Sequence, residues 1–141
     1  MIKKFKKAFT ITELVIVIAV IAILAAVLIP TFSTVISKAN ESAAMQECRN
    51  EWTEMSVDII GNEEKGDDYL FKYKNGKDTY YYIVVDGNFN ATKLPTAPSI
   101  PGTLTHEKRT FSVPETGKVS TNNEYITYYA LEETTVSTVG E

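Results

Sequence analysis

The stretch KKAFTITELVIV (Lys6–Val17) decides the fold of the first part of the chain. Two lysines lead into apolar chain, and an unbroken run of sixteen apolar residues follows from Leu14 to Ile29. As α-helix this run would span about 24 Å, and apolar residues on both sides extend it toward the roughly 20 residues that cross a bilayer. We therefore expect one membrane helix whose basic N-terminal end stays in the cytoplasm.

A carboxylate, Glu13, stands one residue before this run. An acidic side chain near the bilayer core costs about 3 kcal/mol on insertion scales, so we expect it to have a partner or a task. The next basic residue along the chain, Lys38, is 25 residues away, and the preceding lysines belong in the head-group region. Cleavage between Ala8 and Phe9 would create an α-amino group four residues before Glu13. In a neighbouring copy shifted along the helix axis, that amine could pair with the carboxylate and offset its burial.

Two other interpretations of this segment stay open. A secretory signal has a basic start, a short apolar centre and a small-residue cleavage site, for which Ala25–Ala26 would serve. The apolar run continues past those alanines, however, and Glu13 does not suit such a signal. Alternatively, Glu13 is a tolerated residue at the membrane edge.

The pattern KKAFTITELVIV…AILAAVLIP closely resembles the class III signal of type IV pilins. It fits a short basic leader, a small residue before the cleavage point, a phenylalanine after it, a glutamate four residues further on and a proline at residue 30. The resemblance implies cleavage after Ala8 by a prepilin peptidase and N-methylation of Phe9. It also implies polymerisation into a helical filament with bundled N-terminal helices, in which Phe9, Glu13 and Pro30 are assembly residues.

Three positions depart from the family pattern. Ala8 stands where the family usually has glycine, Thr12 where an aliphatic residue is common, and Ala22 where a glycine is common. In the family, that glycine and the proline bracket a segment of the helix that loosens inside assembled filaments. Since alanine is a good helix former, such loosening is less expected between Ala22 and Pro30. The resemblance further implies an assembly ATPase and a membrane platform protein as partners, because the chain carries no nucleotide-binding loop.

A second helical half is predicted beyond Pro30. The proline ring clashes with the carbonyl of Ala26, which predicts a kink and not a stop, because apolar periodicity resumes at once. Two stripes at steps of three and four residues follow, offset from one another, and Gly61 is a candidate C-cap. The stripes are Phe32, Ile36, Ala39 and Ala43, then Met45, Cys48, Trp52, Met55 and Ile59. We expect one face to pack on a sheet and another to meet neighbouring subunits.

The remaining residues predict a small antiparallel sheet. Aromatic and β-branched content favours strands, Asn75–Gly76 and Asp86–Gly87 favour tight turns, and a proline-rich segment at residues 94–102 favours a surface loop. The four expected strands are Tyr69–Tyr73, Thr79–Val85, Arg109–Val113 and Tyr125–Leu131. The fold class is thus α+β: a long kinked N-terminal helix, with a membrane half and an amphipathic half, on a small antiparallel sheet. The expected parts are a leader at 1–8, the hydrophobic half of the helix at 9–32, its amphipathic half at 33–61 and a β head at 62–141.

Composition narrows the function. The formal net charge is −4, and it would be −8 without the four lysines of the leader, so the body should repel nucleic acid. Cys48 is the only cysteine, and we interpret it as a buried core thiol in preference to an intersubunit disulfide. The only histidine, His106, is expected to be exposed. Without a cysteine–histidine cluster or a glycine-rich phosphate loop, we expect no metal, no cofactor and no enzyme.

One basic patch favours nucleic acid locally. Lysines and aromatic residues interleave in the first predicted hairpin, and this pairing suits stacked bases and phosphates. The residues are Lys72, Lys74 and Lys77 with Phe71, Tyr73 and Tyr80. We favour the other interpretation, a hairpin whose outward lysines prevent edge pairing, so DNA contact is not expected.

The sequence therefore favours a structural subunit of a type IV pilus, anchored in the cytoplasmic membrane as a precursor and then assembled on the cell surface, where it serves motility, adhesion or DNA uptake. Because Gram-negative members of that family usually carry a C-terminal cysteine pair, the resemblance together with the single cysteine implies a Gram-positive source. One alternative is a pseudopilin of a type II secretion or competence system. Major pseudopilins usually carry an acidic calcium-binding loop near the C-terminus, and Asn122–Glu124 matches such a loop only weakly. Another is a monomeric membrane-anchored binding module, which predicts no cleavage after Ala8.

Overall fold

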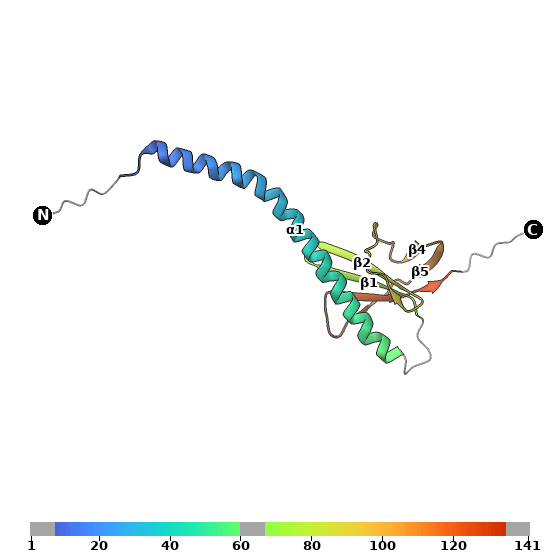
Figure 1. Ribbon diagram of the computed structural model, residues 1–141. Helices are drawn as coiled ribbons and strands as arrows, with labels where there is room; N and C mark the ends of the chain where they lie inside the picture. The colour runs from blue at the N-terminus through green and yellow to red at the C-terminus, as the bar shows by residue number, and fades with distance from the viewer. Residues whose placement is uncertain (1–7, 60–66, 135–141) are drawn as a thin grey trace, which may run out of the picture. The chain divides into compact units, whose positions relative to one another are not determined.

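One long helix and eight strands make up the described part of the protein, residues 8–59 and 67–134 of a computed structural model. The helix is α1 (Ile11–Ile59), and Figure 1 shows the strands gathered beside its C-terminal half. The strands are β1 (Tyr69–Asn75), β2 (Asp78–Val85), β3 (Asn88–Phe89), β4 (Gly102–His106), β5 (Arg109–Val113), β6 (Lys118–Val119), β7 (Ile126–Ala130) and β8 (Glu132–Glu133). This is the α+β architecture that the sequence predicts.

Helix α1 continues through Pro30 without a break, as its sequence predicts. Its 49 residues correspond to about 74 Å at 1.5 Å per residue. Hydroxyls flank the proline: Thr31 donates to the Val27 carbonyl at 3.1 Å and Thr34 to the Pro30 carbonyl at 3.3 Å. Such side-chain bonds help to satisfy a helix backbone that a proline has disturbed. The predicted cap Gly61 lies outside the described residues.

The chain divides into two compact units, Met1–Asn40 and Glu41–Glu141. The division falls inside α1, so one helix belongs to both. The predicted division of the helix into halves between residues 32 and 33 falls within continuous α1, and it stays a prediction.

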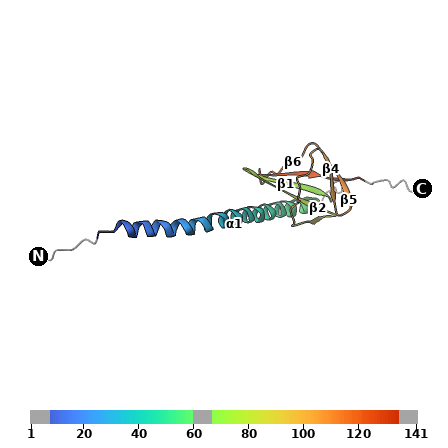
Figure 2. The same cartoon turned by 90° about the horizontal axis from the view of Figure 1, so that it is seen from above.

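In the second unit, the described strands form two antiparallel sheets. The larger sheet has the order β3-β2-β1-β7-β6 and the smaller has the order β4-β5-β8. Residues 41–59 of α1 lie along one face of the larger sheet (Figure 1 and Figure 2). A second cluster on its other face joins it to the smaller sheet through Leu70, Ile83, Leu104, Phe111, Val113, Tyr129 and Leu131.

The second predicted helix stripe is the one that faces the sheet. Cys48 is fully buried and Trp52 is 9% exposed, next to Tyr69 and Phe71. The ring centroids of Trp52 and Tyr69 are 5.6 Å apart, and those of Trp52 and Phe71 are 6.5 Å apart and edge-on. Edge-on and tilted aromatic pairs add to the free energy of burial, so this face of α1 anchors the head.

The other end of the same packed layer is fixed by hydrogen bonds at Glu41. The Tyr82 hydroxyl donates to the Glu41 backbone carbonyl at 3.0 Å, and burial raises the pKa of this tyrosine. The Lys93 ammonium donates to the Glu41 carboxylate at 2.6 Å and lies 5.7 Å from the centre of the Tyr80 ring. Strand β1 therefore runs antiparallel to α1, with Tyr69 beside Trp52 and the β1–β2 turn toward Glu41.

The predicted turns are present. Asp86 and Gly87 have φ of 50° and 75° and form the tight turn between β2 and β3. The β1–β2 hairpin is also tight, and its ends are the paired residues Asn75 and Asp78, so Gly76, at φ 62°, comes first in the turn. The predicted tight turn at Asn75–Gly76 is thus confirmed, with Gly76 and Lys77 as its two central residues. Glycine adopts this φ without a steric penalty.

Arg109 ties the smaller sheet to the turns of the larger one. Its guanidinium donates to Glu133 at 2.7 and 2.9 Å and to Asp86 at 2.7 Å, and it lies 3.7 Å from Asp68. The hydrogen bonds from Arg109 lower the pKa of Glu133. This network holds β5, β8 and the β2–β3 turn together.

Candidate processing and assembly site

The site predicted from the sequence begins just before α1. Ala8, Phe9 and Thr10 are exposed and not helical, and the Phe9 side chain is 84% exposed. The predicted cleavage point between Ala8 and Phe9 therefore lies in accessible, non-helical chain ahead of Ile11. The rest of the predicted leader, residues 1–7, lies outside the described residues.

Glu13 and Thr10 form a reciprocal cap at the start of α1. The Thr10 backbone N–H and hydroxyl donate to the Glu13 carboxylate at 3.0 and 2.8 Å, and the Glu13 N–H donates to the Thr10 hydroxyl at 3.3 Å. This is the capping box, in which a threonine and a glutamate three residues later satisfy the free N–H groups of a helix start. The sequence TITE (Thr10–Glu13) has the spacing of a capping box, but a cation was the only partner predicted for Glu13.

The cap gives the Glu13 carboxylate two donors within its own chain. A negative charge near a helix N-terminus is also stabilised by the helix dipole. The carboxylate is consequently partnered in a single copy, and an amine from a second copy would be an additional partner.

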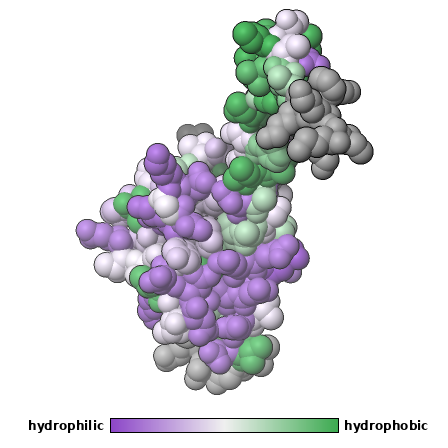
Figure 3. Space-filling model, turned by 90° about the vertical axis from the view of Figure 1, so that its left-hand side faces the viewer, coloured by the Kyte–Doolittle hydropathy of each residue, from purple (hydrophilic) through white to green (hydrophobic). Residues whose placement is uncertain are grey.

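The first unit leaves its apolar side chains uncovered. Between Leu14 and Ile36 the large apolar side chains are 50–70% exposed, and Figure 3 shows the hydrophobic colour concentrated on this part of the chain. An eighteen-residue window within α1 has a mean hydropathy of 3.1 and none of it is buried, so α1 is long and apolar enough to cross a membrane. A helix that is apolar all round requires lipid or protein around it. Ala22 and Pro30 both lie in this uncovered helix.

The lysines of the β1–β2 hairpin do not form the patch that would suit nucleic acid. Phe71 is fully buried, and Tyr73 and Tyr80 are only 5% and 9% exposed, because all three pack in the cluster under α1. They cannot stack on bases, whereas Lys74 and Lys77 are exposed.

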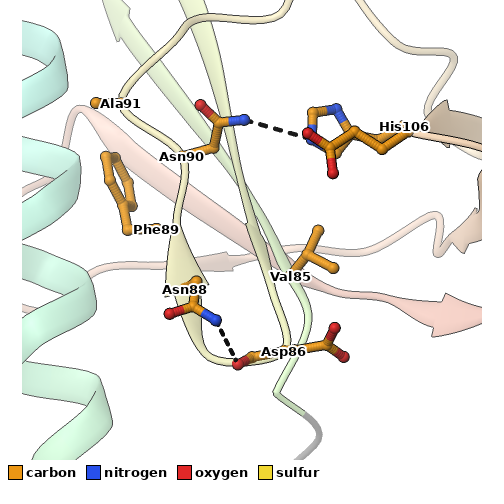
Figure 4. A pocket seen from close by; sticks show the side chains of 8 residues that line it. Val85, Asp86, Asn88, Phe89, Asn90, Ala91 and His106 are labelled. Atoms are coloured by element: carbon orange, nitrogen blue, oxygen red, sulfur yellow. Dashed lines mark hydrogen bonds and ion pairs between the residues drawn. The ribbon is translucent and has the colours of Figure 1, made fainter.

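His106 lies in a shallow polar cavity of about 430 Å³, lined also by Val85, Asp86, Asn88, Phe89, Asn90, Ala91 and Glu107 (Figure 4). The prediction that it is exposed is wrong, because its side chain is 19% exposed. The Thr92 backbone N–H donates to the side-chain Oδ1 of Asn90 at 2.9 Å, so the side-chain Nδ2 of Asn90 faces His106 Nε2 at 3.3 Å. His106 Nε2 must therefore accept, so the ring bridges the β3 and β4 regions. No serine, threonine or cysteine lines this cavity.

Cys48 is the buried thiol that the sequence predicts. It is fully buried, and burial together with the neighbouring Glu47 and Glu51 carboxylates raises its pKa to about 12. A thiol that stays protonated is neither a nucleophile nor a good metal ligand.

The loop with the weak match to a calcium site, Asn122–Glu124, is hydrogen-bonded to α1. Asn122 donates to Glu54 and Asn123 donates to Glu47 through their side-chain amides, and both backbone N–H groups bond the Ser120 hydroxyl. Within residues 8–59 and 67–134, no three acidic, histidine or cysteine side chains are grouped so as to hold a metal ion.

Comparisons with known proteins identify the N-terminal pattern. Residues 3–29 match the family described as the prokaryotic N-terminal methylation motif. The N-terminal part of this chain therefore carries this motif. The chain is similar to two type IV major fimbrial proteins FimA of Dichelobacter nodosus, at 34% identity over 68 residues for one and 29% over 107 residues for the other.

The likeness covers part of each relative. The two alignments include 48% and 64% of this chain, and 44% and 59% of the FimA chains, so the chain spans about half the length of the curated relatives it matches. No solved structure gives a significant match. Both relatives are named as fimbrial proteins, which are structural proteins.

Proposed function

We propose that the protein is a structural subunit of a type IV pilus. A prepilin peptidase cleaves the membrane-anchored precursor after Ala8, and the new N-terminal residue, Phe9, is methylated. An assembly ATPase and a membrane platform protein then transfer the subunit from the cytoplasmic membrane into a surface filament. In the filament the helices from Phe9 to about residue 32 pack together at the centre.

The observation that carries this proposal is the uncovered apolar half of α1. In the described part of the chain, the large apolar side chains from Leu14 to Ile36 are at least half exposed, whereas the head has buried cores on both faces of its larger sheet. A segment of this kind needs lipid before assembly and other copies after it. The methylation motif over residues 3–29 supports processing at its start.

The role of Glu13 is tested by separating its charge from its cap. Glu13→Ala removes both, whereas Glu13→Gln keeps a side chain that completes a capping box and removes the charge. If the charge pairs with the amine of Phe9 in a neighbouring copy, both variants lose surface filaments while the precursor stays in the membrane. Filaments are counted by electron microscopy of sheared cells, and precursor by membrane fractionation.

Thr10→Ala is the matched control for the cap. It removes the threonine hydroxyl but keeps both the Glu13 charge and the Thr10 backbone donor. We expect it to keep most filaments. Normal filaments from Glu13→Gln would contradict the assembly role of the charge and leave helix capping as the reason for Glu13.

One observation favours a second candidate, a monomeric membrane-anchored module. The cap satisfies Glu13 within a single copy, so an anchor would need no neighbouring amine. In that case the Ala8–Phe9 bond stays intact. A pseudopilin of a secretion or competence system shares the processing and differs in filament length, which microscopy of the same preparations measures.

A further inference from the structure

Four acidic residues form a column along the C-terminal part of α1. Glu47, Glu51, Glu54 and Asp58 follow at steps of four, three and four residues, which places them on one helix face. Like charges at these spacings destabilise a helix. Among the residues that the structure describes, no lysine or arginine pairs with the first three.

Glu51 is the buried member of the column. It is 8% exposed and lies between Glu47 and Glu54, which receive the amides of Asn123 and Asn122. In the described part of the chain, neither a hydrogen bond nor an ion pair reaches its carboxylate. No fully buried side-chain oxygen or nitrogen among the described residues lacks a partner, so the Glu51 oxygens open onto the cavity that the residue lines. A cation that enters the cavity would meet this unpaired negative charge.

A cavity of about 160 Å³ gives access to this carboxylate. It is lined by Glu51, Glu54, Met55, Asp58, Thr121, Asn122 and Tyr128. Its carboxylate and amide oxygens are acceptors for an ammonium group, which donates three hydrogen bonds and needs no fixed coordination geometry.

Cations without partners lie at the other end of the same head. Lys74 and Lys77 flank the tip of the β1–β2 hairpin, are exposed and make no ion pair with any described residue. The hairpin turn lies toward Glu41, as the Tyr82–Glu41 bond indicates, whereas the cavity is lined by Glu51, Glu54 and Asp58 further along the helix. From Glu41 to Glu54 the helix rises about 20 Å, so these lysines cannot reach the cavity of their own copy.

We propose that the lysine hairpin of one copy docks in the acidic cavity of the next copy and places an ammonium group against Glu51 and Glu54. This contact rests on the proposed function, because it belongs to the filament. The two surfaces differ and lie about 20 Å apart along α1, so the contact is head-to-tail and repeats from copy to copy. It joins the heads outside the apolar helix bundle.

Cross-linking tests the contact directly. We expect filaments of the Thr121→Cys, Lys77→Cys double variant to give a ladder of covalent oligomers under mild oxidation. The two single variants should give none, and Cys48 will not interfere because it is fully buried. Lys108→Cys with Thr121→Cys is the control, since Lys108 is exposed in a different turn, between β4 and β5. Filaments in which the first pair gives no ladder, or the control pair gives an equal one, would overturn the proposal.

Charge reversal provides a second readout. The Lys74→Glu, Lys77→Glu variant should reduce recovered filaments about tenfold or more, because like charges across an interface are strongly repulsive. Adding Glu54→Lys to this variant should raise the amount of recovered filaments at least fivefold. Lys108→Glu in the unaltered chain should change that amount little. Unchanged filaments in the hairpin variant, or filaments lost on chelation of divalent metals, would contradict docking by lysine. If the unaltered chain forms no filaments, the proposed function itself fails, which distinguishes the two results.

Discussion

The two parts of α1 differ in how their apolar side chains are covered. Between residues 14 and 36 the large apolar side chains are at least half exposed, whereas the face that carries Cys48 and Trp52 is closed under the sheet. One continuous helix thus has an uncovered part and a covered part. The difference shows that the head has a core of its own, to which the N-terminal part of the helix does not contribute.

The largest expected effect on the covered part comes from Trp52→Ala. Removing a buried tryptophan that contacts Tyr69 and Phe71 should lower the free energy of unfolding of the head by about 3–5 kcal/mol. Denaturant unfolding of the detergent-solubilised full chain, followed by tyrosine fluorescence, measures the loss. Val57→Ala is the control, because Val57 lies on the same helix but is 68% exposed, and it should change the value by under about 0.5 kcal/mol.

A charge placed in the uncovered part should impair membrane insertion and filament formation but leave the stability of the head unchanged. Ile21→Lys places a lysine in the apolar run and costs about 3 kcal/mol for membrane insertion. We expect less protein in the membrane fraction and no filaments, with head unfolding unchanged. Ile21→Leu should behave as the unaltered chain. A head destabilised by Ile21→Lys would show that the two parts are not independent.

The bond between the Tyr82 hydroxyl and the Glu41 carbonyl should contribute less. Tyr82→Phe keeps the buried ring and removes one hydrogen bond, so stability should fall by about 1 kcal/mol. Thermal unfolding in the same detergent measures it. No change would mean that water replaces the hydroxyl at that carbonyl.

The smallest expected effect is the acid dependence of the Arg109–Glu133 pair. Arg109 lowers the pKa of Glu133 in the folded state, so the pair stabilises the head above the ordinary glutamate pKa. That contribution disappears as the pH falls below the ordinary glutamate range and through the lowered pKa. The stability difference between the unaltered chain and Arg109→Gln should therefore shrink from pH 6 to pH 3. A constant difference would assign the role of Arg109 to its contact with the Phe111 ring.

The helix could be predicted from its period of three and four residues, and the longer strands from their aromatic and β-branched content. The stripe through Cys48 and Trp52 and the aromatic residues of Tyr69–Tyr73 both belong to surfaces that the chain itself buries. Strand β4 was missed because Gly102–His106 offers only Leu104 as a buried apolar residue, and β3, β6 and β8 have two residues each.

At the candidate site, the sequence indicated the carboxylate but not its cap. The Thr10–Glu13 spacing was readable, since the capping box is a local pattern. The burial of Glu51 was not readable, because it depends on a loop about 70 residues further along, where Asn122 and Asn123 bond to α1. Only tertiary structure shows that this acidic residue of the helix is covered.

The N-terminal residue of the mature protein tests the central claim most directly. Filaments or, failing those, membranes are purified, and the N-terminal peptide is identified by mass spectrometry. The account predicts a chain that begins with N-methylated Phe9 and lacks residues 1–8. A mature chain that still begins with Met1 would contradict processing and assembly, and would make α1 the anchor of a monomeric protein.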